Sequence, residues 1–132
     1  MKVFEEKDQY VISVDNEKNR VVLEVEALND PKKVPNFNKH IKEAIEAIGT
    51  RGFSCLVILS EKLPPPKFQL TASLKAGQKD FIAGGIGKSA VVVSPKSILQ
   101  KMTLQVVTKL SGMNIRVFSG REIAETWLDE KN

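Results

Sequence analysis

Short apolar runs divide the chain into predicted strands. Residues 10–14 and 21–26 are rich in β-branched side chains, and the second run alternates apolar and polar positions. The polar residues 15–19 between them have the composition of a turn, so an antiparallel hairpin is expected. The nearly continuous apolar run at residues 54–60 predicts a central strand covered on both faces. A short buried strand is expected at residues 90–93 and the last strand at residues 115–118.

Apolar residues at helical spacing predict four helices between and after these strands. Ser94 followed by Pro95 is a typical helix start, and Ser119 with Glu122 three residues later fits a capping box. Glycines just beyond the periodic segments mark the helix ends. The expected helices span residues 37–48, 70–83, 95–110 and 120–128.

This succession predicts an α/β fold in the order β-β-α-β-α-β-α-β-α. The sheet is expected to be single, mixed and mostly parallel, with five strands and four helices joined by right-handed crossovers. A chain of 132 residues is long enough for one domain with a hydrophobic core, so residues 1–132 are expected to form a single domain.

Charge is distributed unevenly along the chain. The formal net charge of +4 combines −4 over residues 1–30, +10 over residues 31–120 and −2 over the last twelve residues. A basic middle attracts phosphates, acidic proteins or lipid head groups, although lysines scattered over helix surfaces are more often charges that keep a protein soluble.

Cysteine content and hydropathy predict the compartment. Cys55 is the only cysteine, which excludes an intrachain disulfide and favours a reducing environment. No stretch approaches the roughly 18 apolar residues of a membrane span, and the first seven residues turn acidic where a signal peptide would be apolar. A cytoplasmic protein without a transmembrane segment is therefore expected.

The glycine-rich stretch at residues 84–89, Gly-Gly-Ile-Gly-Lys-Ser, resembles a phosphate-binding loop but fails its requirements. That loop needs a first glycine where this chain has Ile82, and it needs a strand before it and a helix after it. Here the predicted order is reversed. We expect these glycines to end a helix and turn the chain into a strand.

No catalytic constellation emerges from the remaining residues. His40 is the sole histidine and is expected on a solvated helix face, while Cys55 is expected to be an inert core thiol. Acidic residues in the basic middle are isolated, and the phenylalanines fit core positions better than a base-stacking surface. The sequence therefore predicts no enzyme, no cofactor and no metal site, and it gives no strong signal for nucleic-acid binding.

The segment from residue 88 to residue 128 runs strand, capped helix, strand and a final helix closing in Trp127-Leu128. It resembles the STAS/SpoIIAA-like domains, and the order of elements agrees over nearly the whole chain. The resemblance implies an anti-sigma-factor-antagonist-like or partner-binding module, with relatives of Sec14-type architecture that hold lipids. The family's phosphorylated Asp-Ser motif is replaced here by Pro64-Pro65-Pro66, which leaves Thr71 and Ser73 as candidate phosphorylation sites.

Two functions follow as alternatives. The first is a non-enzymatic interaction module that binds an unknown protein or a second copy of itself as a homodimer. Its candidate interface is Leu104 and Val107, which lie off the apolar stripe of their predicted helix. The second is a binder of an anionic small molecule or lipid in a basic cleft at the carboxyl ends of the parallel strands. Its candidate anion loop contains Ser94, Lys96 and Ser97.

Overall fold

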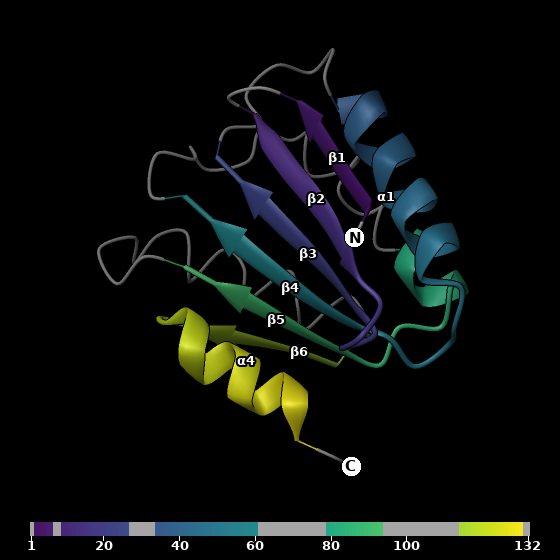
Figure 1. The fold of residues 1–132 in the computed structure, drawn as a ribbon. Coiled ribbons are helices and arrows are strands. Elements are labelled where there is room, and N and C mark those ends of the chain that lie inside the picture. The colour runs from purple at the N-terminus through teal and green to yellow at the C-terminus, as the bar shows by residue number, and fades with distance from the viewer. Residues whose placement is uncertain (1, 7–8, 27–33, 61–78, 94–113, 131–132) are drawn as a thin grey trace.

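The chain forms an α/β structure around one mixed sheet (Figure 1). The computed structural model describes residues 2–6, 9–26, 34–60, 79–93 and 114–130. Within them the strands lie side by side in the order of the sequence. The first three strands pair antiparallel, and the last four pair parallel. They are β1 (Lys2–Glu6), β2 (Tyr10–Asp15), β3 (Arg20–Val25), β4 (Ser54–Leu59), β5 (Lys88–Val92) and β6 (Asn114–Phe118).

Most of the predicted strands are confirmed, but the predicted number is wrong. The described residues hold six strands where five were expected, because β1 precedes the predicted hairpin. Its sequence, Lys-Val-Phe-Glu-Glu, offers only two apolar residues and so gives no strand pattern. Charged residues are common on edge strands, where they discourage pairing with other chains.

Three helical segments fall within the described residues: α1 (Val34–Ile48), residues 79–83 and α4 (Arg121–Asp129). The first and fourth predicted helices and the end of the second are thereby confirmed. The third predicted helix, residues 95–110, lies outside the described residues. The predicted capping box is wrong by one position, since the N-cap of α4 is Gly120 in an extended conformation and no side chain caps the helix.

α1 and α4 lie on opposite faces of the sheet (Figure 1). Alternate residues of β2 and β3 point toward α1 because successive strand side chains face opposite sides. Ile12 and Leu23, for example, are register partners and are both buried under α1. The core on this side contains Tyr10, Ile12, Val14, Val21, Leu23, Val25, Phe37, Ile41, Ala44, Ile48, Phe53, Cys55 and Phe81.

The face opposite α1 has a smaller core beneath α4. Ala124 and Leu128, one helical turn apart, are buried against strand residues. Phe118 and Trp127 extend this core, with their ring centroids 5.6 Å apart. The strand residues of this core are Leu56, Ala90 and Val92. α4 therefore covers the half of this face that β4, β5 and β6 form.

Candidate functional site

The glycine-rich stretch forms a tight turn between a helix and a strand. Residues 79–83 are helical, Gly85 has a positive φ of 87°, and β5 begins at Lys88. A Cβ on Gly84 would lie 2.5 Å from Cγ2 of Ile45 in α1, so only glycine lets the two segments approach this closely. The predicted context, a helix before the glycines and a strand after them, is confirmed.

Lys88, the lysine of this stretch, holds the C-terminus of α4. Its side chain is largely buried, and Nζ donates hydrogen bonds to the carbonyl oxygens of Trp127 at 3.0 Å and Glu130 at 2.9 Å. Trp127 lies in the last turn of α4 and Glu130 is its C-cap residue, whose N–H also donates to the Trp127 carbonyl at 3.3 Å. The helix dipole favours a cation at this end of the helix. The Lys88 ammonium also lies 5.2 Å from the Trp127 ring centroid.

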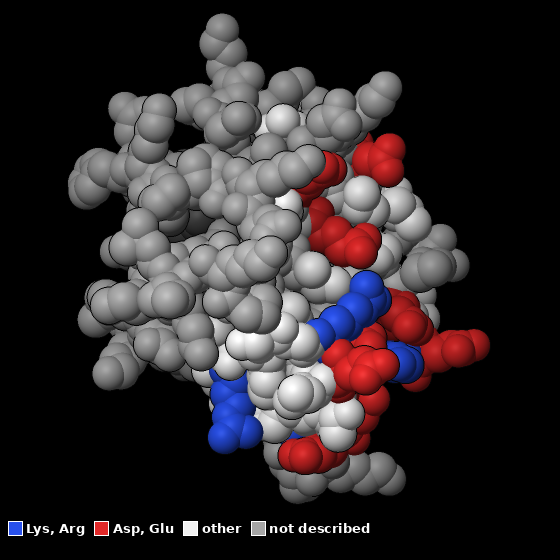
Figure 2. All heavy atoms as spheres, turned by 90° about the vertical axis from the view of Figure 1, so that its left-hand side faces the viewer, with Lys and Arg blue, Asp and Glu red and all other residues white. Residues whose placement is uncertain are grey.

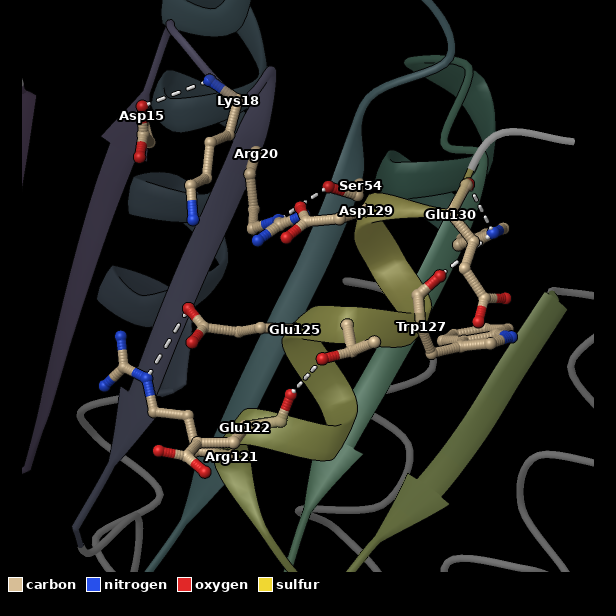
Figure 3. Close-up of polar contacts among 12 residues, drawn as sticks. Asp15, Lys18, Arg20, Ser54, Arg121, Glu122, Glu125, Trp127, Asp129 and Glu130 are labelled. Carbon is tan, nitrogen blue, oxygen red and sulfur yellow. Dashed lines mark hydrogen bonds and ion pairs between the residues drawn. The ribbon is translucent and has the colours of Figure 1, made fainter.

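Arg20 holds the same end of α4 from the neighbouring side. Only 2% of Arg20 is exposed, and its Nε donates to Ser54 Oγ at 2.9 Å (Figure 3). Its Nη2 pairs with Asp129 Oδ1 at 2.5 Å. The hydrogen bond from Arg20 lowers the pKa of the Asp129 carboxyl below its usual value.

Arg20, Ser54 and Lys88 are the first residues of adjacent strands β3, β4 and β5, and we call them the polar row. Register places Arg20 opposite Ser54, and the pairing of Cys55 with Ser89 places Ser54 beside Lys88 on the same face. Arg20 and Lys88 both bind groups at the C-terminal end of α4, so the polar row is a structural anchor for that helix. Sequence reasoning missed it because each residue stands just where an apolar run begins.

His40 lies in a partly buried aromatic contact, so the predicted solvated position is wrong. Its Nδ1 shares a 2.7 Å hydrogen bond with the Tyr10 hydroxyl, and its ring stacks on Phe4 at a centroid distance of 5.3 Å. Phe4 belongs to β1, the strand that the sequence did not reveal. Without β1, nothing indicated that this side of α1 would be covered.

Cys55 occupies the predicted core position. The residue is 1% exposed in β4, and burial raises the pKa of its thiol to about 12, an effect that a hydrogen bond with Ser89 partly offsets. A thiol so rarely ionised at neutral pH is a poor nucleophile.

The remaining predicted site residues lie outside the described residues, so their roles stay predictions. They are the candidate anion loop Ser94, Lys96 and Ser97, the candidate interface Leu104 and Val107, and the candidate phosphorylation sites Thr71 and Ser73.

Among the residues that the structure describes, no helix covers one half of the α4 face of the sheet. α4 reaches β4, β5 and β6, whereas β1, β2 and β3 continue the same face beyond it (Figure 1). Val3 is 52% exposed there, and Val11 and Val22 are partly exposed. We call this surface the open half; its residues are Val3, Glu5, Val11, Ser13, Asp15, Val22 and Glu24.

Two rows of side chains cross the open half. Val3, Ser13 and Val22 are register partners in one row, and Glu5, Val11 and Glu24 form the next. Each strand therefore contributes one valine to a face that no described helix covers. In antiparallel strands with one solvated face, the side chains on that face are usually polar. Three valines on such a face are therefore unexpected.

Acidic side chains border these valines. Glu5 and Glu24 are exposed on either side of Val11. Arg121 of α4 lies 3.7 Å from Glu125 (Figure 3) and 3.6 Å from Glu24, so a single guanidinium is shared between two carboxylates. Figure 2 shows acidic side chains gathered along one side of the described surface.

Comparison with known proteins found neither a protein-family model nor a curated protein that matches the chain. Among the described residues, no helix is both long and apolar enough to cross a membrane. The same residues contain no cluster of three or more histidine, cysteine, aspartate or glutamate side chains suited to a metal ion.

Proposed function

We propose that the chain is a non-enzymatic protein-interaction module of the STAS/SpoIIAA-like type, and that the open half is its docking surface. The family assignment is supported by the resemblance over residues 88–128. The docking surface is supported by one observation above all: α4 covers half of a sheet face, and on the other half Val3 is exposed while Val11 and Val22 are partly exposed.

Burial of these valines favours binding. Fully burying an exposed valine side chain contributes roughly 1.5 kcal/mol or more, and these partly exposed valines contribute correspondingly less. The surface is also preorganised, because its three strands are paired along their whole lengths and their opposite faces are fixed against α1. Because this surface is already ordered, the chain loses little conformational entropy when a partner binds it.

The proposal predicts a site-specific contact at residue 3. One variant carries a photo-crosslinking amino acid in place of Val3. A control variant carries it in place of Glu46, an exposed residue of α1 on the opposite face of the sheet. Irradiation in the cells that make the protein should give a discrete adduct from position 3 and none from position 46.

The crosslinked protein is then purified and its affinity for the chain is measured directly. Val11→Asp should weaken binding at least about tenfold, because it places a charge at the centre of the docking surface. A matched Glu46→Ala variant should bind as the wild type does. The same affinity for Val11→Asp, at an unchanged melting temperature, would contradict the proposal.

A further inference from the structure

We infer that the open half binds a cationic amphipathic helix of a partner protein, an inference that rests on the proposed docking function. Two features carry it. The open half has exposed glutamates on either side of Val11 whose charge is only partly balanced, and α4 already shows how a helix lies on this face of the sheet.

The negative charge of the open half is only partly balanced. Arg20 is buried and committed to Asp129, and Arg121 is shared between Glu24 and Glu125. Glu5 forms no ion pair within the described part of the chain. Residues 1–30, which supply all three strands of the open half, carry a net charge of −4. A partner that brings lysine or arginine side chains would therefore meet carboxylates that lack a full counter-charge.

The spacing of these groups suits a helix. Neighbouring strands lie about 4.8 Å apart, so Glu5 and Glu24, two strands apart with Val11 between them, are separated by roughly 10 Å. A helix with its side chains is about 10–12 Å wide. Its apolar stripe would contact the three valines while basic residues on its two flanks reach the carboxylates on either side.

The existing packing of α4 supports a helical occupant. α4 places Ala124 and Leu128 on β4 and β5, and Val22 of β3 already packs against the edge of that core. A second helix over β1, β2 and β3 would lie beside α4 and complete the layer that α4 begins. The flank of α4 that carries Arg121, Glu125 and Asp129 would then face the incoming helix.

The test uses a fluorescein-labelled helical peptide of about 18 residues made of leucine and lysine at amphipathic spacing. Its control has glutamate in place of every lysine. Binding is followed by fluorescence anisotropy with the full chain. We expect the lysine peptide to bind at least about tenfold more tightly than the glutamate peptide, and its affinity to fall as salt rises to about 0.5 M.

Paired charge reversals locate the binding site. Glu5→Lys with Glu24→Lys should weaken binding of the lysine peptide at least about tenfold. Glu43→Lys with Glu46→Lys on α1 changes the net charge equally and should leave the affinity within about twofold of the wild type. Both double variants alter charges that are at least partly exposed, and circular dichroism checks that each is folded.

Several results would overturn the inference. Equal loss of affinity in both double variants would mean that only net charge matters. Equal binding of the two peptides, abolished by Val11→Asp, would refute the cationic partner while leaving the docking surface intact. Self-association of the wild-type chain that Val11→Asp abolishes would make a second copy the occupant. The docking function itself fails if residue 3 gives no specific crosslinked partner, or if Val11→Asp binds that partner as tightly as the wild type does.

Discussion

In the folded protein, the thiol of Cys55 is expected to react with dithiobis(nitrobenzoate) at least about 1,000 times more slowly than in the unfolded chain. The residue is 1% exposed, and burial raises the pKa of its thiol to about 12. Reaction therefore requires an opening of the fold that exposes and ionises the sulfur. Absorbance of the released thiolate measures the rate with and without denaturant.

A matched control places a thiol where the structure exposes one. Val3→Cys adds a second cysteine at a position that is 52% exposed, and this thiol should react at nearly the unfolded rate while Cys55 stays protected. Rapid labelling of Cys55 in the native wild type would contradict the packing of β4.

The same burial predicts how stability changes at high pH. The thiol pKa is raised from 9.0 to about 12, so the folded chain holds this proton more tightly than the unfolded chain does. The resulting stabilisation is fully present below about pH 9 and is lost as the pH rises toward 12. Urea unfolding at pH 8 and pH 10.5 should therefore show a smaller fall in stability for Cys55→Ala than for the wild type.

Lys88→Met is expected to lower the free energy of unfolding by about 2 kcal/mol. Methionine keeps most of the buried stem but removes the ammonium that donates to the carbonyl oxygens of Trp127 and Glu130. Those carbonyls lose a charged donor at the end of a helix whose dipole favours a cation. Urea denaturation followed by Trp127 fluorescence measures the change.

Lys42→Met is the matched control for this prediction. Lys42 is an exposed residue of α1, so its replacement should change stability by less than about 0.5 kcal/mol. An unfolding free energy for Lys88→Met equal to or above that of the wild type would show that removing a buried charge outweighs the lost hydrogen bonds. The polar row would then not be an anchor of α4.

The fold could be predicted from sequence wherever buried residues recur at the regular spacing of a strand or a helix. The alternation in residues 21–26 gave β3, and the apolar run from Ser54 gave β4, because both patterns follow directly from burial of strand faces. β1 could not be found this way, since it is an edge strand with charged residues and only two apolar ones. Missing β1 also misplaced His40, whose neighbour Phe4 belongs to that strand.

The polar row and the open half depend on contacts between residues far apart in the sequence, which the local pattern of apolar and polar residues does not reveal. Nothing near Arg20 or Lys88 in sequence indicates that the end of α4, 39 or more residues away, supplies their partners. Val11 and Val22 lie in predicted strands, but Val3 belongs to β1, which the sequence did not reveal, and whether a helix covers these valines depends on where α4 lies on the sheet. The sequence-derived interface at Leu104 and Val107 stays a separate prediction.

Carboxyl footprinting tests the docking surface most directly. The chain is labelled with a carbodiimide and glycine amide, alone and with the partner identified through residue 3, and each glutamate is quantified by mass spectrometry. We predict that Glu5 and Glu24 are modified in the free protein and protected in the complex, while Glu43 and Glu46 on α1 are modified equally in both. Protection of Glu43 and Glu46, with Glu5 and Glu24 unchanged, would contradict the assignment of the open half as the docking surface.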